Sequence, residues 1–255
     1  MKVLLTGASG ALGSEVHAYF PAALAPSHEE LDIRDSSSLN RIFLKFKPDL
    51  VIHMAAIADV RLCEENRELA WSTNVEGTGN IVRACAESGS DPLLLYPSSP
   101  CVFKGDSGNY AESSKANPEN YYGQTKQAAE AEVSRYKNSI IFRKNFVRRG
   151  RWKYPRAFTD RFGTYLFADE IAYIIALFPQ SGIRGIVHIA GDKRLSMFEL
   201  AKITTPDIMP MTMKDADLRL AQDMSLISER IEPFSMTRSA VRPKDYSHLK
   251  IRLRE

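Results

Sequence analysis

The chain has 255 residues, of which 44% are hydrophobic and 25% charged, a composition typical of a globular protein rather than a disordered or membrane-embedded one. Its net charge of +3 is too small to indicate nucleic-acid binding. No apolar run approaches the roughly 20 residues that span a bilayer, and Met1-Lys2 leads directly into a strand-like segment. We therefore expect a cytoplasmic protein without a secretory leader, with no membrane or nucleic-acid partner. Three cysteines at unrelated spacings predict no metal site.

The first half of the chain alternates short apolar runs with longer segments of helical periodicity, which is typical of βαβ units around a parallel sheet. Asp35 and the serines after it predict the start of a helix, because short polar side chains cap helix N-termini. These patterns predict an α/β protein with a Rossmann-type, doubly wound parallel sheet. The expected strands are 2–6, a short one near Leu24, 49–53 and 92–96, and the expected helices run from Leu12 through Phe20, from Asp35 to Phe46 and from 67 to 87.

The second half becomes less regular after residue 144. Residues 97–119 are rich in Ser, Pro, Gly and Asn and predict a loop. We expect residues 1–145 to form a dinucleotide-binding domain, to which a strand and a helix at about 167–190 return. Residues 146–166 and 191–255 are expected to form a small substrate-binding cap at the C-terminal side. The other expected elements are a helix from Tyr122 to Tyr136, a strand at 139–142, a helix at 167–177, a strand at 186–189 and a helix at 196–203.

A glycine-rich turn follows the first predicted strand. Gly7, Gly10 and Gly13 have a G-x-x-G-x-x-G spacing, which is looser than the strict dinucleotide fingerprint. Glycine lets the backbone turn tightly and approach a pyrophosphate, whose charge is favoured at the start of a helix. The turn therefore predicts a nucleotide-phosphate site that also includes Ser9, Ala11 and Leu12.

Asp32 lies near the distance at which a carboxylate binds an adenosine ribose in such folds. It sits between Leu31 and Ile33, however, which is more like the end of a third strand, where it would face the adenine ring. Ser27-His28 would then occupy the turn that discriminates between cofactors. Because that turn appears in the sequence without an acid, we expect NADP(H) to be favoured, with NAD(H) as the alternative.

Tyr122 and Lys126 lie four residues apart, which places them on one face of a helix. A tyrosine with a pKa of about 10 needs a stabilised anion to act as an acid–base group at neutral pH, and a nearby ammonium supplies that stabilisation. Tyr121 fails this test, because Thr125 stands four positions on from it. Ser99, after an apolar strand, can hydrogen-bond a carbonyl oxygen at the ligand-binding end of a sheet. We therefore predict that Ser99, Tyr122 and Lys126 are the catalytic residues.

Arginine and lysine crowd into residues 143–156. Guanidinium groups match phosphate oxygens bidentately, so this segment is either a diphosphate site or a solvated basic face. His53 and His188 lie inside apolar strands and are interpreted as core histidines with satisfied hydrogen bonds rather than as ligands.

Taken together, these motifs resemble those of the extended short-chain dehydrogenase/reductases, and within them the dTDP-4-dehydrorhamnose reductase group. The resemblance covers most of residues 1–205. It rests on the segments 6–13, 31–35, 53–56, 72–78, 98–103, 121–126 and 185–191.

The resemblance implies NADPH- or NADH-dependent reduction of a 4-keto nucleotide sugar, in a protein for which a homodimer is possible. It assigns Ala55, Ala56 and Asn74 to the cofactor side, together with Asp32-Ile33 at the adenine. It places Ser99, Phe103, Phe146 and Arg149 at the substrate. Pro100-Cys101 stands where the group usually has Asp-Tyr, and Phe146 where the reductases often have Trp. A nucleotide-sugar epimerase or dehydratase, and a non-catalytic regulatory subunit that binds NADP, are the alternatives.

Overall fold

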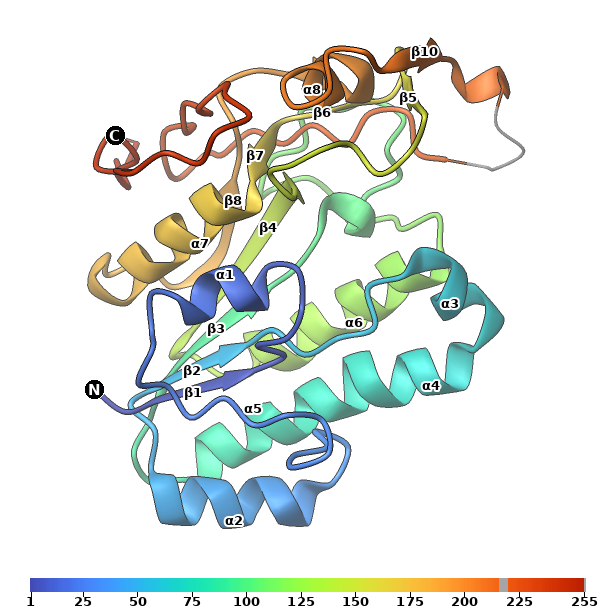
Figure 1. Ribbon diagram of the computed structural model, residues 1–255. Helices are drawn as coiled ribbons and strands as arrows, with labels where there is room; N and C mark the ends of the chain where they lie inside the picture. The colour runs from blue at the N-terminus through green and yellow to red at the C-terminus, as the bar shows by residue number, and fades with distance from the viewer. Residues whose placement is uncertain (216–219, 255) are drawn as a thin grey trace.

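The computed structural model describes residues 1–215 and 220–254, and its centre is a twisted parallel sheet (Figure 1). Four of its strands are β1 (Val3–Thr6), β2 (Leu50–His53), β3 (Leu93–Pro97) and β4 (Ser139–Val147), in that order across the sheet. Two strands pair with the other edge of β4: β8 (Gly185–Ile189) with residues 140–144 and β7 (Tyr165–Phe167) with residues 145–147. Every pairing in this sheet is parallel, which confirms the predicted parallel sheet.

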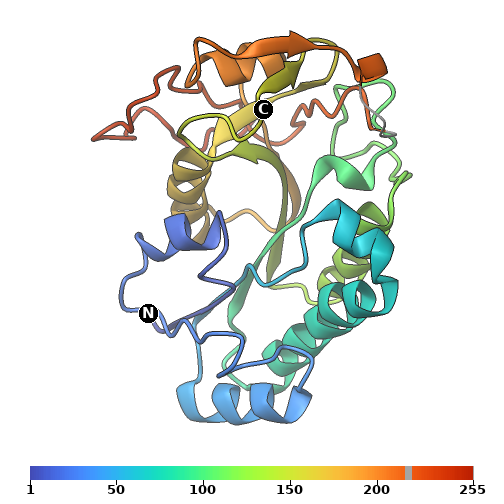
Figure 2. The same cartoon turned by 45° about the vertical axis from the view of Figure 1, so that its right-hand side comes forward.

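Helices cover both faces of the sheet, as Figures 1 and 2 show. Alternate residues of each strand enter different cores: Leu5 and Leu95 pack on one face, Leu4 and Leu94 on the other. Strands buried on both faces are continuously apolar, which explains the apolar runs in the sequence. None of the described helices is long and apolar enough to cross a membrane. α1 (Gly13–His17) and α7 (Ala168–Leu177) lie on the first face, and α2 (Ser36–Phe46), α5 (Gly77–Glu87) and α6 (Tyr121–Ser134) on the second.

Asp35 caps α2 as predicted. Its Oδ1 accepts hydrogen bonds from the backbone N–H groups of Ser37 and Ser38, at 2.9 and 3.2 Å. The helix ends at Lys47, which has a left-handed backbone with φ of 49°. The buried Leu39 and Phe43 then attach α2 to the sheet through the second core.

Two predicted elements near the N-terminus are shorter than expected. The strand near Leu24 is reduced to one bridge to Leu4, because the segment leaves the sheet edge at Pro26 before a ladder can form. The helix predicted from Leu12 through Phe20 is an α-helix only over Gly13–His17, and turns follow it at residues 18–19 and 21–22. The local pattern of apolar residues could not show where this strand or this helix ends.

The helix predicted over residues 67–87 is not continuous. It begins as α4 (Arg67–Trp71), passes through a π-helix at Ser72–Glu76 and continues as α5. A further short helix, α3 (Val60–Glu65), precedes it and is capped by the Asp59 side chain. The π-helix contains the buried Asn74, so the interruption lies at one of the predicted site residues.

The part of the chain beyond β4 contains short strand pairs that lie above the main sheet in Figure 1. The domain boundaries proposed from the sequence stay a prediction, but the core contacts change the assignment of one segment. Ile231, Phe234, Tyr246 and Leu249 are buried in the same core cluster as α1 and α7, so we place residues 231–249 with the sheet domain. The elements of the upper part are β5 (Arg156–Phe158) with β10 (Met209–Met211), β6 (Phe162–Gly163) with β9 (Leu195–Ser196), and α8 (Met197–Lys202).

Candidate active site

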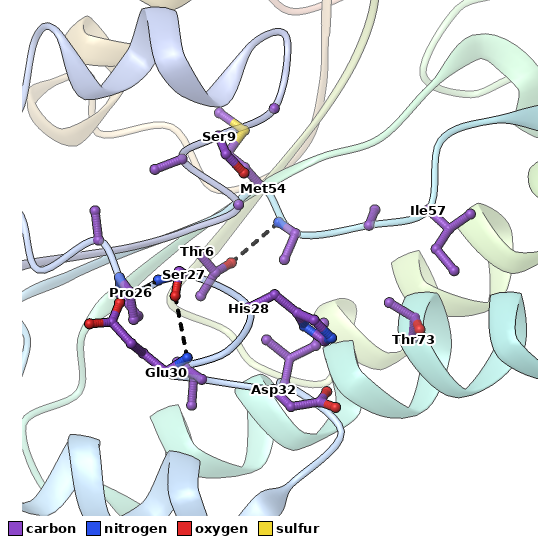
Figure 3. Close-up of a pocket in the computed structure, with 18 of the residues that line it drawn as sticks. Thr6, Ser9, Pro26, Ser27, His28, Glu30, Asp32, Met54, Ile57 and Thr73 are labelled. Carbon is purple, nitrogen blue, oxygen red and sulfur yellow. Dashed lines mark hydrogen bonds between the residues drawn. The ribbon is translucent and has the colours of Figure 1, made fainter.

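A cavity of about 690 Å³ opens beyond the carboxyl ends of β1 and β2, where open α/β sheets bind ligands (Figure 3). In Figure 3, Ser9 lies towards one end of the group of lining side chains and Asp32 towards the other. The structure thus brings the glycine turn together with the segment around residue 30 and with the end of β2. The cavity is lined by residues 6–10, 25–28, 30–34 and 54–57, and by His17, Leu69 and Thr73.

Each of the three glycines of the turn is required for a different structural reason. Gly7 has a left-handed backbone with φ of 70°, and a Cβ there would lie 2.5 Å from the backbone nitrogen of Ala55. A Cβ on Gly13 would lie 2.1 Å from the carbonyl oxygen of Gly7. Gly10 is exposed, lines the cavity, and a Cβ would meet only the Gly7 oxygen, at 3.3 Å. Gly7 and Gly13 therefore shape the turn, whereas Gly10 leaves space for a ligand.

The other predicted residues of the turn also fall into two groups, those that face the cavity and those that support the turn. Ser9 is exposed and lines the cavity, and Ala11 is half-buried just beyond it. Leu12 is buried in the core beneath α1, so its side chain supports the turn rather than facing a ligand.

The Ser27-His28 turn does contain an acid, contrary to the premise of the cofactor prediction. The Glu30 carboxylate accepts a hydrogen bond of 2.8 Å from the backbone N–H of Ser27, and the Glu30 N–H donates to Ser27 Oγ (Figure 3). Glu30 lines the same cavity as Ser27 and His28. The side chain reaches the turn from two residues beyond it, through local hydrogen bonds that residue spacing did not reveal.

Asp32 and Ile33 line the cavity from a loop rather than from the end of a third strand. Arg34 holds the Asp32 carboxylate through Nε and Nη2, at 3.0 and 2.6 Å, and these hydrogen bonds lower the pKa of Asp32. Asn80 fixes the loop from α5, because its Nδ2 donates to the carbonyl oxygen of Ile33. Neither residue is in the sheet, but both face the space predicted for the adenosine.

Ala55 and Ala56 follow β2 and line the cavity, as predicted for the cofactor side. Asn74 does not line it. Its side chain is buried and fully used: Oδ1 accepts from the backbone N–H of Ile57, while Nδ2 donates to the Ile57 carbonyl oxygen and to Thr125 Oγ1. Asn74 therefore fixes the segment after β2 against α6 and acts on the cavity only through Ile57.

His53 is a satisfied core histidine, as predicted. Its Nδ1 lies 2.8 Å from Thr6 Oγ1 and its Nε2 lies 3.1 Å from Thr78 Oγ1. Because the Thr78 hydroxyl donates its proton to the carbonyl oxygen of Asn74, Nε2 of His53 is the donor and Nδ1 accepts from Thr6. Burial, with the nearby Lys126, lowers the pKa of His53 to about 3 and keeps the ring neutral. His188 is likewise buried, with Nδ1 bonded to backbone carbonyl groups.

Ser99 and Tyr122 meet beyond the end of β3. Ser99 caps the 3-10 turn at Pro100–Val102, and its Oγ accepts a 3.2 Å hydrogen bond from the Cys101 N–H. Its side chain also lies near the Tyr122 hydroxyl. Burial raises the pKa of Tyr122 above its usual value, the neighbouring Cys101 acts in the same direction, and the Ser99 hydroxyl opposes them. The two predicted catalytic hydroxyl groups are thus neighbours.

Lys126 approaches the same place, but it does not stabilise the Tyr122 anion in this structure. Its Nζ donates to the hydroxyl oxygen of Tyr96 at 2.6 Å and to the carbonyl oxygen of Pro97 at 2.8 Å. Burial and the neighbouring Lys144 lower the pKa of Lys126 to about 7, against the opposing effect of Glu130. The ammonium is directed at the end of β3, because α6 packs Lys126 against that strand.

Two residues beside this site were not singled out from the sequence. Tyr96, the last buried residue of an apolar strand, accepts the hydrogen bond of Lys126. Lys144 is buried on β4; its Nζ donates to the Ser98 carbonyl oxygen at 3.2 Å and lies 4.8 Å from the centre of the Phe146 ring. The apolar residues before it on β4 could have indicated that Lys144 is buried, but the arginines around it in the sequence suggested an exposed position.

The basic segment 143–156 is not uniformly a solvated face, because two of its arginines have partners inside the protein. Arg143 is buried and bidentate to Glu130 of α6, at 2.9 and 2.6 Å. The structure does not bring Arg149 to the site: its Nε donates to Asp169 and its Nη1 to the carbonyl oxygen of Ser239. Buried charges need such partners, and these arginines find them inside the protein. Only the outer members, such as Arg151, remain exposed.

Phe103 and Phe146, predicted at the substrate, have different surroundings. Phe103 is buried and stacks on Tyr110, with ring centres 4.4 Å apart, and it also borders a second cavity of about 750 Å³. Phe146 is half-buried beneath Lys144. The second cavity lies between α3, the segment after the 3-10 turn and the upper part of the chain. Its lining includes residues 60, 61, 64, 65, 103–106, 119, 120, 213, 220–222 and 224.

The sequence is similar to those of several known proteins. The chain is 32% identical over 143 residues to methionine adenosyltransferase 2 subunit beta of Bos taurus, a match that covers 52% of this chain and 42% of that protein. It is 28% identical over 227 residues to dTDP-4-dehydrorhamnose reductase of Mycobacterium tuberculosis, with 79% and 73% covered. The chain therefore spans less than half the length of the first of these relatives.

Among solved structures, dTDP-4-dehydrorhamnose reductase from Bacillus anthracis in complex with NADP superposes with a TM-score of 0.81 at 23% identity. The match covers 89% of this chain and 91% of that one, and it confirms the Rossmann-type fold. The family model described as the RmlD substrate binding domain matches residues 1–253. The chain therefore belongs to the RmlD substrate-binding-domain family, within the extended short-chain dehydrogenase/reductases.

Proposed function

We propose that this protein is an NAD(P)H-dependent reductase of a nucleotide-linked 4-keto sugar. One observation carries the proposal: Ser99 and Tyr122 lie beside each other beyond the end of β3, with Lys126 directed at the end of the same strand. The names of the M. tuberculosis and B. anthracis relatives supply the substrate class.

The residues present fit a nicotinamide dinucleotide. Gly10 leaves open the space that a side chain would fill, and the cavity continues from the turn past Ala55 to Asp32. Gly7 to Gly10 would hold the pyrophosphate, Asp32 and Ile33 the adenosine, and Lys126 the ribose next to the nicotinamide. When bound, the cofactor supplies the hydride.

The chain itself supplies orientation and a proton. The Oγ of Ser99 already accepts from the Cys101 N–H, so its own proton is available for a ketone oxygen. Tyr122, raised in pKa by burial, holds its proton at neutral pH and donates it to that oxygen as the negative charge develops. The second cavity, bordered by Phe103, would take the sugar nucleotide.

The test is a turnover assay with NADPH and a panel of nucleotide-linked 4-keto sugars. We expect NADPH to be oxidised with a keto sugar and not with the same sugar already reduced at that carbon. No oxidation with any keto sugar, in protein that binds NADPH, would contradict the proposal. An epimerase would instead release an epimer without net consumption of NADPH. A dehydratase normally has a carboxylate next to the serine, and Pro100-Cys101 offers none.

A second candidate is a non-catalytic subunit that binds NADP. The match to a protein named as a subunit of methionine adenosyltransferase favours it, although that match covers only 52% of this chain. The subunit hypothesis expects NADPH binding without reduction of any carbonyl compound, so the same assay separates the two.

We further propose NADP(H) rather than NAD(H) as the cofactor. His28 and Arg34 line the cavity and favour a 2′-phosphate, while Glu30 opposes it. We expect NADPH to bind more tightly than NADH at equal ionic strength, as measured by fluorescence titration. Glu30→Gln should strengthen NADPH binding roughly two- to fivefold, the scale of an exposed charge pair, and leave NADH unchanged. Tighter binding of NADH would show that Glu30 or Asp32 reaches the ribose.

A further inference from the structure

Lys144 is a buried cation for which the proposed reaction has no role. Only 8% of the residue is exposed, and its Nζ has a backbone carbonyl group and an aromatic ring as partners. Within residues 1–215 and 220–254, no carboxylate lies within ion-pairing distance of it, whereas Arg143, its neighbour on the strand, is paired with Glu130. A buried charge without a counter-ion is costly, so its position calls for a functional explanation.

The position of Lys144 is defined by the strand. Phe142 and Phe146 pack with the core that contains α1 and the end of the glycine turn, and Lys144 lies between them on the same strand face. Lys126 comes from α6, on the opposite face of the sheet. The two lysines meet at the carboxyl end of β3, where Lys144 reaches Ser98 and Lys126 reaches Pro97. The two ammonium groups are close enough that Lys144 lowers the pKa of Lys126.

A dinucleotide that runs from the glycine turn to Tyr122 must bring its nicotinamide end to this place. The oxidised nicotinamide ring carries a positive charge, whereas the reduced ring is neutral. A like charge nearby disfavours the charged form of a group, and the effect is strong where water is excluded.

We propose that Lys144 makes the cofactor site select the reduced nicotinamide, so that NADPH binds more tightly than NADP⁺. This inference rests on the proposed cofactor site. The buried ammonium repels the oxidised ring and leaves the reduced ring unaffected. It therefore favours loading with hydride donor and release of the oxidised product, which suits a reductase.

The experiment measures dissociation constants for NADPH, NADP⁺ and 2′-phospho-ADP-ribose, which lacks the nicotinamide, by calorimetry at pH 6.5. Burial lowers the pKa of Lys144 to about 8, so the side chain is charged at that pH. We expect Lys144→Met to tighten NADP⁺ binding by roughly tenfold, the scale of a partly screened charge pair. NADPH and 2′-phospho-ADP-ribose should change by less than about twofold. Lys144→Arg, which keeps the charge, should retain the wild-type preference for NADPH.

The matched control is Lys137→Met, which removes the same charge from an exposed position just before the start of β4. It should change none of the three constants. An equal change for all three nucleotides in Lys144→Met would overturn the inference, because it would indicate a general contact or a structural effect. Unchanged constants would also overturn it. If wild-type protein binds none of the three, the proposed cofactor site itself fails, and this inference fails with it.

Discussion

Tyr122→Phe is expected to reduce turnover by roughly 10²–10⁴-fold, the contribution of general acid–base catalysis. The change removes one oxygen and keeps the ring, so NADPH binding should survive. It also removes the hydroxyl that lies beside Ser99, the second proposed catalytic residue. Steady-state kinetics with a 4-keto sugar nucleotide, together with an NADPH titration, would measure both effects.

Tyr121→Phe is the internal control. Arg67 lies over the Tyr121 ring at 4.9 Å, and the Tyr121 N–H donates to Glu64. These contacts direct Tyr121 towards α3 and α4 rather than towards Ser99. The control should therefore keep full activity. Damage from Tyr121→Phe with none from Tyr122→Phe would mean that the acid is misassigned, and no effect from either would favour the non-catalytic subunit.

Gly10→Val is expected to weaken NADPH binding by roughly 10- to 100-fold while the protein stays folded. Gly10 does not have a left-handed backbone, and a Cβ there meets only the Gly7 carbonyl oxygen, at 3.3 Å, so we expect the turn to accept valine with its side chain in the cavity. The magnitude follows from the roughly 1–3 kcal/mol cost of overpacking a filled space. Fluorescence titration would give the affinity, and thermal denaturation would confirm the fold.

The neighbouring glycines cannot serve for this test. Any side chain on Gly13 would overlap the Gly7 carbonyl group, so lost binding there would report a distorted turn. Gly79→Val, in α5 and outside the cavity, is the better control, because its Cβ meets only the flexible Glu132 side chain at 3.7 Å. Equal NADPH affinity in Gly10→Val and wild type would argue against the dinucleotide site.

The parallel sheet could be predicted, and candidate catalytic residues could be chosen, because both depend on local patterns. Apolar runs that fill strands buried on both faces are readable, and so is the four-residue spacing of Tyr122 and Lys126. The direction of the Lys126 side chain was not readable, because Tyr96 and Pro97 come from a strand about thirty residues away. Composition also misled at residues 143–156, where Arg143 and Arg149 find acidic partners on α6 and α7.

The cofactor turn shows a similar limit. Ser27-His28 contains no acid when read along the chain, yet Glu30 folds back onto the Ser27 N–H. The prediction of a strand near Leu24 was wrong for a different reason. Strand propensity is a property of one segment, whereas a strand also needs a partner strand over several residues, and Leu24 forms only one bridge. Several residues that line the cavity, such as Gly10, Asp32 and Ala55, were thus easier to predict than the hydrogen bonds that orient such residues.

The π-helix at Ser72–Glu76 has a consequence for how this protein can change in evolution. A π-turn accommodates one residue more than an α-turn, so the segment from Arg67 to Glu87 carries the equivalent of a single inserted residue. Deleting one residue of the π-turn would restore a regular helix: the flanking helices would keep their orientation, and the side chains of the turn itself would point in different directions. Asn74 would then lose Ile57 and Thr125 together. Point substitutions outside the π-turn should leave these contacts in place, whereas deletion of a residue within it should not.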